Sequence, residues 1–201
     1  YDVGEHNHIR LRGADWNDGL DMAEKRGESV AFTALYGGNL RDLAKDIMTL
    51  SKKTGKDTIS LAKEIEVLLN ADKTVYDSID EKHKVLNAYC NAVGHKVSGE
   101  KVSVDCTKLC NVLNEMSSWI ADHIRKTEWI TNKEGNSWFN GYYDNHGRPV
   151  EGKRDNHVRM MLTGQVFSVM GNVADDAQTA AIIKSADLYL YKKEVGGYRL
   201  N

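Results

Sequence analysis

Hydrophobic residues recur at three- and four-residue intervals over most of this chain. Between residues 28 and 50 the apolar positions are Tyr36, Leu40, Leu43, Ile47 and Leu50. This spacing places their side chains on one face of an amphipathic helix. Gly55 follows the pattern and is predicted to end it, because glycine readily adopts the backbone conformation found after helix C-termini.

Similar spacing predicts five further helices. They are expected at about residues 58–70, 76–93, 105–124, 160–170 and 175–191. Asp105 is a good N-cap for the long helix that follows it. Asp175, with Gln178 three residues later, is typical of a capping box.

Two segments interrupt the helical pattern. Residues 96–104 alternate loosely around Ser98 and Gly99, which predicts a small hairpin or an ordered loop. Residues 131–155 are rich in Gly, Asn and aromatic residues and contain the only proline, Pro149, which predicts a long loop of polar turns. Long loops on a helical scaffold commonly carry functional residues. We therefore expect an all-α fold with chemistry-bearing loops at the helix ends.

The composition narrows the class of protein. Hydrophobic residues make up 41% and charged residues 28%, as in ordinary globular domains. The formal net charge of −2 argues against a nucleic-acid-binding protein, because binding to phosphates normally needs a basic surface. No stretch approaches the about twenty apolar residues of a membrane-spanning helix, and residues 1–5 lack the basic and apolar regions of a signal peptide. We expect a cytoplasmic protein that binds neither nucleic acid nor membrane.

Cysteine and histidine give little reason to expect a metal. The three cysteines, Cys90, Cys106 and Cys110, suit a reducing compartment. Cys106 and Cys110 lie one helical turn apart, but no partner pair stands at ligand spacing, so buried thiols are expected. His6 and His8 would share a face only on a strand, and we interpret them as part of a loop. We expect no metal and no cofactor.

The densest group of chemically useful residues lies between Asp15 and Asp21. This segment holds three carboxylates, an amide and Trp16. A Trp ring can stack on the apolar face of a sugar, and a carboxylic acid pressed against an aromatic ring has a raised pKa and can donate a proton. These groups suit the leaving-group side of a glycosidic-bond cleavage site. The residues alone are equally compatible with an acidic capping segment before the helix that starts near Glu28.

Several motifs resemble the cellobiose and chitobiose phosphorylase family. Ala14-Asp15-Trp16-Asn17-Asp18-Gly19 is similar to its Asp-Trp-Asn-Asp signature. Further similar segments follow in order: Gly27-Glu28-Ser29-Val30, Trp129 with Asn140-Gly141-Tyr142-Tyr143-Asp144, residues 162–170, and Gly197-Tyr198-Arg199-Leu200. An ordered set of motifs is more specific than the signature alone.

The resemblance implies a fold and a reaction. The family's catalytic domain is an (α/α)6 barrel of paired helices, and its members invert the anomeric centre. Asp18 would be the general acid that protonates the glycosidic oxygen, while inorganic phosphate, as co-substrate, attacks the anomeric carbon and gives an α-sugar 1-phosphate. One acid suffices because phosphate is already anionic, whereas an inverting hydrolase needs a second carboxylate to activate water. The full-length protein would be a homodimer acting on a β-linked gluco-oligosaccharide.

The resemblance also implies sugar-binding residues. Asp15, Trp16 and Asn17 would contact the sugar from the signature. Gln165 lies in a segment that approaches the sugar in relatives, although a buried packing amide is an equal alternative. Tyr142 would line the site or order a turn.

The chain departs from the family in two respects. The positions that would match the family's phosphate-binding Arg, His and Thr-Gly pair fall before Tyr1 and after Asn201. Residues 1–201 are therefore expected to be a partial catalytic domain that is inactive alone. Residues 51–102 are expected to be a helical insertion. They would form an outer elaboration, shape a site for longer β-glucans, or build an oligomer interface. The β-1,2-oligoglucan phosphorylases are the subgroup we favour.

Two other functions remain open from the sequence. One is an inverting glycoside hydrolase, whose base would stand roughly 6.5–9.5 Å from the acid, with Glu28, Asp144 and Glu151 as the candidates. The other is a non-catalytic carbohydrate-binding module that uses Trp16 without turnover.

Overall fold

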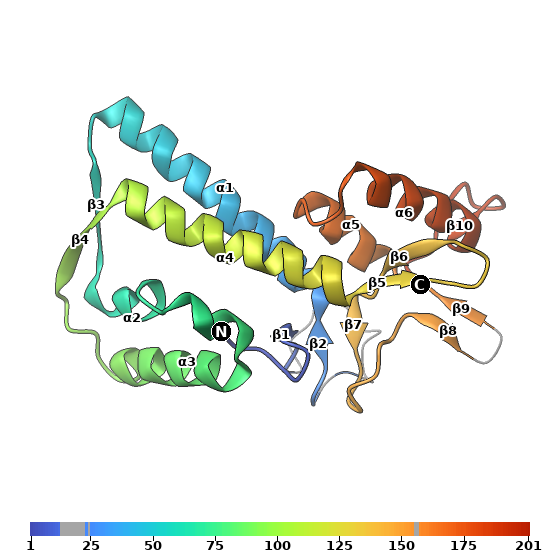
Figure 1. The fold of residues 1–201 in the computed structure, drawn as a ribbon, viewed down its shortest axis with the longest axis horizontal. Coiled ribbons are helices and arrows are strands. Elements are labelled where there is room, and N and C mark those ends of the chain that lie inside the picture. Colours follow the sequence, from blue (N-terminus) through green and yellow to red (C-terminus); the bar gives the residue numbers. More distant parts are fainter. Residues whose placement is uncertain (13–22, 24, 155–156) are drawn as a thin grey trace. The chain divides into compact units, whose positions relative to one another are not determined.

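The computed structural model describes every residue except 13–22, 24, 155 and 156 (Figure 1). The described residues divide into two compact units. The first unit comprises residues 1–3 and 39–119, and the second unit comprises residues 4–38 and 120–201. Helices α1 (Val30–Thr54) and α4 (Cys106–Thr127) contribute residues to both units. No helix in the described part of the chain has the length and apolar character needed to cross a bilayer.

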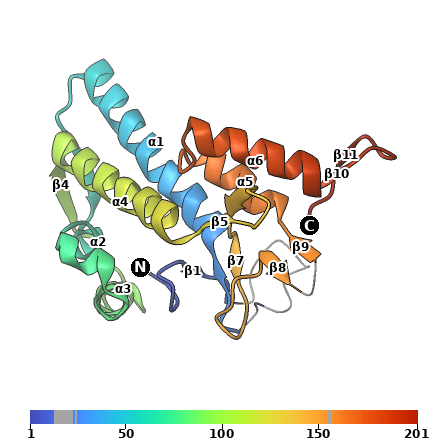
Figure 2. The same ribbon diagram turned by 45° about the vertical axis from the view of Figure 1, so that its right-hand side comes forward.

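In the first unit, α1 and α4 lie antiparallel and side by side (Figures 1 and 2). Their contact is made by Ala44 of α1 and by Leu109, Cys110 and Leu113 of α4, all of which are buried. The Cys110 thiol donates to the Ala44 carbonyl over 3.2 Å. The expectation that Cys106 and Cys110 are buried thiols is confirmed.

The rest of the first unit contains a pair of strands with helices between them in the sequence. β3 (Thr58–Ala62) pairs antiparallel with β4 (Lys101–Asp105) over five residues. Between them come η2 (Lys63–Ile65), α2 (Glu66–Leu69), η3 (Lys73–Asp77) and α3 (Ile79–Val93). The segment 51–102 thus lies within the first unit and is only partly helical. The helix expected at 58–70 is wrong in its first half, where β-branched Thr58 and Ile59 belong to a strand.

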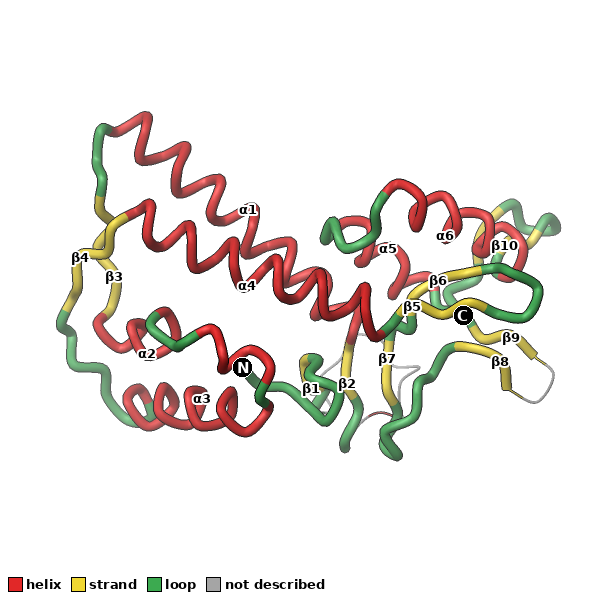
Figure 3. Tube along the Cα trace, viewed as in Figure 1, coloured by secondary structure: helices red, strands yellow, loops and turns green. Residues whose placement is uncertain are grey.

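The second unit combines short strand pairs with two helices (Figure 3). Its three-stranded sheet has the order β1 (Ile9–Arg10), β2 (Glu28–Ser29), β7 (Tyr142–Tyr143). The other pairs are β5 (Trp129–Thr131) with β6 (Ser137–Phe139), β8 (Gly152–Arg154) with β9 (His157–Arg159), and β10 (Tyr191–Lys192) with β11 (Gly197–Tyr198). The helices are α5 (Leu162–Met170) and α6 (Asp176–Tyr189).

The core of the second unit is formed by residues far apart in the sequence. Its fully buried members include Val30, Ile124, Trp138, Phe139 and Leu190. Trp138 and Phe139 come from the segment 131–155, which was expected to be a loop of polar turns. That expectation is wrong, because four strands, β5 to β8, take residues from it. Its aromatic residues are core residues rather than exposed ones.

Three helix boundaries expected from capping residues are confirmed. The Asp105 carboxylate accepts a hydrogen bond from the Lys108 amide over 2.7 Å. Asp175 and Gln178 form a reciprocal capping box. Gly55 follows α1 with a φ of 66°, a conformation that glycine adopts without steric cost.

The expected fold class is wrong. Over the described residues the structure is mixed, with 52% helix and 18% strand, six α-helices and five small antiparallel sheets, and it is not an all-α part of a helical barrel. Hydrophobic periodicity did not predict these strands, because each spans only two to five residues and its pairing partner cannot be read from the local pattern.

Candidate functional site

The signature residues lie outside the described part of the chain. These are the proposed catalytic Asp18 and the proposed sugar contacts Asp15, Trp16 and Asn17. The structure does describe both ends of their segment. The Leu11 amide donates to the Gly27 carbonyl over 3.0 Å, and β1 pairs antiparallel with β2. Leu11 and Gly27, which flank the segment that holds the signature, therefore lie side by side in the second unit.

The motif Gly27-Glu28-Ser29-Val30 turns the chain from this point into α1. A Cβ on Gly27 would lie 2.1 Å from the Ala23 carbonyl oxygen, so only glycine fits there. Ser29 caps the helix, since its hydroxyl accepts from the Phe32 amide over 3.0 Å. Local structure thus explains the glycine at position 27 and the serine at position 29.

The Glu28 carboxylate points to the N-terminal turn of the second unit. It is 1% exposed. It accepts hydrogen bonds from the backbone amides of His6, at 3.1 Å, and His8, at 3.0 Å. Its Oε1 also lies 2.8 Å from Nδ1 of His6. Glu28 is therefore a structural anchor for residues 4–8.

The motif Asn140-Gly141-Tyr142-Tyr143-Asp144 lies next to the motif Gly27-Glu28-Ser29-Val30. In the β2–β7 pair, Glu28 is opposite Tyr143 and Ser29 is opposite Tyr142. Tyr142 is fully buried, in a cluster that includes Leu11 and Ala23. Tyr142, expected to contact the sugar, thus packs against residues on both sides of the signature segment.

Asn145 makes a further connection between the two motifs. Its Oδ1 accepts hydrogen bonds from the backbone amides of Lys25, at 2.7 Å, and Arg26, at 2.8 Å. These two residues follow the signature by a few positions. Sequence reasoning missed Asn145. An asparagine directly after Asp144 in a turn-rich segment was the available signal, because Asn side chains often bond backbone groups of turns.

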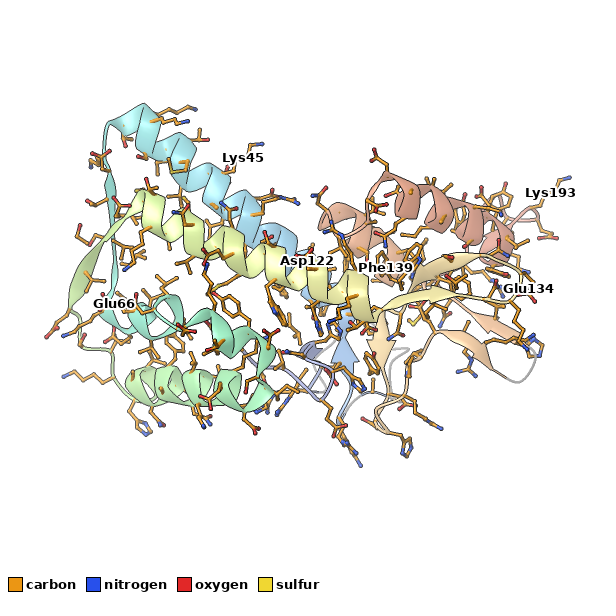
Figure 4. The ribbon with its side chains drawn as sticks, in the orientation of Figure 1. Lys45, Glu66, Asp122, Glu134, Phe139 and Lys193 are labelled. Atoms are coloured by element: carbon orange, nitrogen blue, oxygen red, sulfur yellow. The ribbon has the colours of Figure 1, made fainter. Side chains whose placement is uncertain are left out.

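Gln165 lies on α5 and is buried with partners inside the protein. Its Oε1 accepts from the Phe139 amide over 3.0 Å. Its Nε2 donates to the Phe139 carbonyl at 2.8 Å, to Glu151 Oε2 at 3.2 Å and to the Met161 carbonyl at 3.3 Å. Phe139, labelled in Figure 4, ends β6. The side chain therefore joins α5 to β6, which corresponds to the packing alternative.

Glu128 is the centre of a buried polar network in the second unit. It follows α4 and is 2% exposed. The Tyr143 hydroxyl donates to Oε1 over 2.9 Å, the Asn140 amide donates to Oε2 over 2.9 Å, and His8 Nε2 lies 3.0 Å from Oε1. A carboxylate can only accept hydrogen bonds, so His8 carries its proton on Nε2. The ring of His6 stacks on Tyr143 with centroids 3.6 Å apart.

The buried network shifts two pKa values. Burial by itself raises the pKa of Glu128. The hydrogen bond and charge of His8, together with the hydrogen bonds from Asn140 and Tyr143, outweigh burial and hold the pKa below its usual value. Burial and the adjacent Glu128 carboxylate raise the pKa of the Tyr143 phenol well above its ordinary value. Glu128 is therefore ionised and Tyr143 is a neutral hydrogen-bond donor.

Two other carboxyl groups have pKa values that are shifted in opposite directions. Burial raises the pKa of Glu151 to about 8, against the opposing effect of the amides of Met161 and Gly141. Burial also raises the pKa of Asp144, but the hydrogen bonds of Arg148 and the His146 amide outweigh it, so that pKa lies below its usual value. Neither side chain is exposed by more than 4%.

The described residues contain no group of three or more His, Cys, Asp and Glu side chains placed to hold a metal ion. No protein-family model matches the chain, and no curated protein matches it significantly. The likeness to the phosphorylase family therefore rests on the sequence motifs alone.

Proposed function

We propose that this chain carries the leaving-group side of the active site of an inverting β-glycoside phosphorylase. Asp18 donates its proton to the glycosidic oxygen as the bond from that oxygen to the anomeric carbon breaks. An oxygen of inorganic phosphate forms the new bond to the anomeric carbon from the opposite face. The products are an α-sugar 1-phosphate and the released sugar with its hydroxyl restored, and Asp18 regains its proton before the next cycle.

The observation that carries this proposal is the pairing of β2 with β7. It brings the motif 27–30, which follows the signature in the sequence, beside the motif 140–144, although more than a hundred residues separate the two. Both motifs belong to the set that resembles the phosphorylase family. Asn145 adds a second connection between them through the amides of Lys25 and Arg26.

The state of the candidate base residues favours phosphorolysis over hydrolysis. An inverting hydrolase needs a carboxylate that reaches a water molecule across the sugar ring. Glu28, Asp144 and Glu151 are exposed by 1%, 3% and 4%, and each accepts at least two N–H hydrogen bonds inside the protein. Among the described candidates, none is placed to activate water. Phosphate needs no such base.

The test is a turnover assay with and without inorganic phosphate. The complete gene product is incubated with cellobiose, sophorose or chitobiose, and the products are separated. We expect α-sugar 1-phosphate from one of these disaccharides only when phosphate is present. Asp18→Asn should lower the rate by about 10²–10⁴-fold, the usual contribution of a general acid. Asp46→Asn, which changes an exposed aspartate of α1, should leave it unchanged.

Two outcomes would overturn the proposal. Release of free sugar without phosphate would identify a hydrolase and direct attention to a base not yet recognised. Binding of a disaccharide without any turnover would identify a carbohydrate-binding module.

A further inference from the structure

A groove in the first unit has the side chains of a sugar-binding surface. It lies between η3 and α4 and has a volume of about 500 Å³. Two of the residues that line it are aromatic, Tyr76 and Trp119, and three are small and polar, Asn111, Asn114 and Ser118. None of these residues belongs to the motifs of the phosphorylase resemblance.

The aromatic residues of the groove are held in fixed positions. The centroids of Tyr76 and Trp119 are 6.2 Å apart, with the rings inclined by 53°. The indole N–H of Trp119 donates to the Asp77 carboxylate over 2.9 Å, and the Lys82 ammonium lies 3.9 Å from the centroid of the Trp119 ring. Tyr76 is 7% exposed and supports the half-buried Trp119, which is the ring that a ligand can contact. A ring that is already ordered loses little conformational entropy when a ligand packs against it.

The polar side chains of the groove are available for a ligand. Asn111, Asn114 and Ser118 follow one another at intervals of three and four residues, so they share one face of α4. All three are exposed. Within the described part of the chain, neither Asn111 nor Asn114 makes a side-chain hydrogen bond. Each amide offers donors and an acceptor, which matches the dual character of sugar hydroxyl groups.

The charges of the groove favour a neutral ligand. Lys73 Nζ lies 2.7 Å from Glu115 Oε1, so these two charges compensate each other. Asp77 accepts from the indole of Trp119, and its charge is compensated by the nearby Lys82 ammonium. The groove thus presents no uncompensated cationic cluster for an anionic ligand such as a nucleic acid. The half-buried Trp119 ring beside free amides, without net charge, suits a carbohydrate.

We infer that this groove is a second carbohydrate site, which binds a gluco-oligosaccharide. The groove is inferred from its own residues, and only the choice of glucose as the sugar rests on the proposed function. Such a site would bind a longer oligosaccharide without taking part in bond cleavage.

The test measures binding separately from turnover. Binding of cello-oligosaccharides and β-1,2-linked gluco-oligosaccharides is followed by calorimetry in the Asp18→Asn background. We expect Asn111→Ala/Asn114→Ala to weaken binding of the longer oligosaccharides about tenfold, as expected for two lost hydrogen bonds. The matched control is Asn87→Ala/Asn91→Ala, which removes two exposed asparagines of α3 and should bind as the parent does. Both variants change exposed side chains, and their circular dichroism checks that they fold.

The outcomes separate this inference from the proposed function. If the two double variants bind oligosaccharides equally well, or if the parent binds none, the groove is not a sugar site, whatever the turnover assay shows. If the α4 variant alone loses binding while no phosphorolysis is found, the groove stands and the phosphorylase proposal fails. In the expected case, Asn111→Ala/Asn114→Ala made in a chain that keeps Asp18 cleaves disaccharides at the wild-type rate.

Discussion

The imidazole of His8 and the carboxylate of Glu128 lie 3.0 Å apart, although 120 residues separate them in the sequence. Both side chains are fully buried. With Asn140 and Tyr143 as further donors, Glu128 connects the turn before β1, the end of α4 and strand β7. Strands β1 and β2 flank the segment that holds the signature, and β7 pairs with β2, so this buried carboxylate orders the surroundings of that segment.

Removing the Glu128 carboxylate should strongly destabilise the second unit. Glu128→Ala leaves the hydrogen-bond donors of His8, Asn140 and Tyr143 buried without an acceptor. Breaking such a buried charged network costs about 3–5 kcal/mol of unfolding free energy. Urea unfolding followed by fluorescence measures the loss. Glu134→Ala, which changes an exposed residue of the β5–β6 turn (Figure 4), should cost less than about 0.5 kcal/mol. Similar values for the two variants would contradict the assigned role of Glu128.

Asn145 should affect turnover more than stability. Asn145→Ala removes the acceptor for the amides of Lys25 and Arg26, close to the signature segment. Since a small displacement of catalytic groups can lower a rate by as much as about 100-fold, we expect a decrease in kcat of at least about tenfold. The loss of stability should stay near about 1 kcal/mol.

A conservative variant tests the reason for that effect. Asn145→Asp keeps the oxygen that accepts both hydrogen bonds, so it should retain most of the wild-type kcat. If Asn145→Asp and Asn145→Ala are equally slow, the hydrogen bonds to residues 25 and 26 are not what the site requires.

The sequence predicted those features of the fold that local chemistry determines. Asp105 and Asp175 are recognisable as helix caps because a capping side chain bonds an amide only three residues away. The strand at Thr58–Ala62 was not recognised. Its pairing with Lys101–Asp105 depends on contacts across some forty residues, and periodicity over so short a segment does not distinguish strand from helix.

The same limit applies to the candidate site. The motifs 27–30 and 140–144 were recognised as motifs, but their proximity through β2 and β7 was not predicted. Glu128 was missed, because a glutamate after a helix is usually exposed. Its burial follows from donors that lie 12, 15 and 120 residues away. Tertiary partners, rather than local pattern, decide which carboxylates are buried.

A close backbone approach explains the glycine in Leu162-Thr163-Gly164. A Cβ on Gly164 would lie 2.9 Å from the Cα of Gly141 and 3.2 Å from Glu151 Oε1. Gly164→Ala should therefore destabilise the chain by about 1–3 kcal/mol, as overpacking usually does. Gly197→Ala is the control, because a Cβ there meets nothing within 4 Å. Thermal unfolding of both variants gives the comparison, and an unchanged midpoint for Gly164→Ala would show that α5 can move away at no cost.

The raised pKa of Glu151 predicts a dependence of stability on pH. Its value is about 8 in the folded chain against an ordinary value of 4.5. Between these values the folded chain keeps a proton that the unfolded chain has lost. The stabilisation is fully present below pH 4.5 and is lost as the pH rises through 8. Glu151→Gln cannot ionise. We expect this variant to be less stable than wild type at low pH. Its side-chain NH2 group can only donate, and it faces the backbone N–H of Gly141 or of Met161, which also donates. The difference in stability should shrink as the pH rises.

Urea unfolding at several pH values measures both curves, and Glu134→Gln should follow wild type throughout. A difference that stays constant from pH 5 to 9 would mean that Glu151 is ionised over the whole range, held as a carboxylate by its N–H donors.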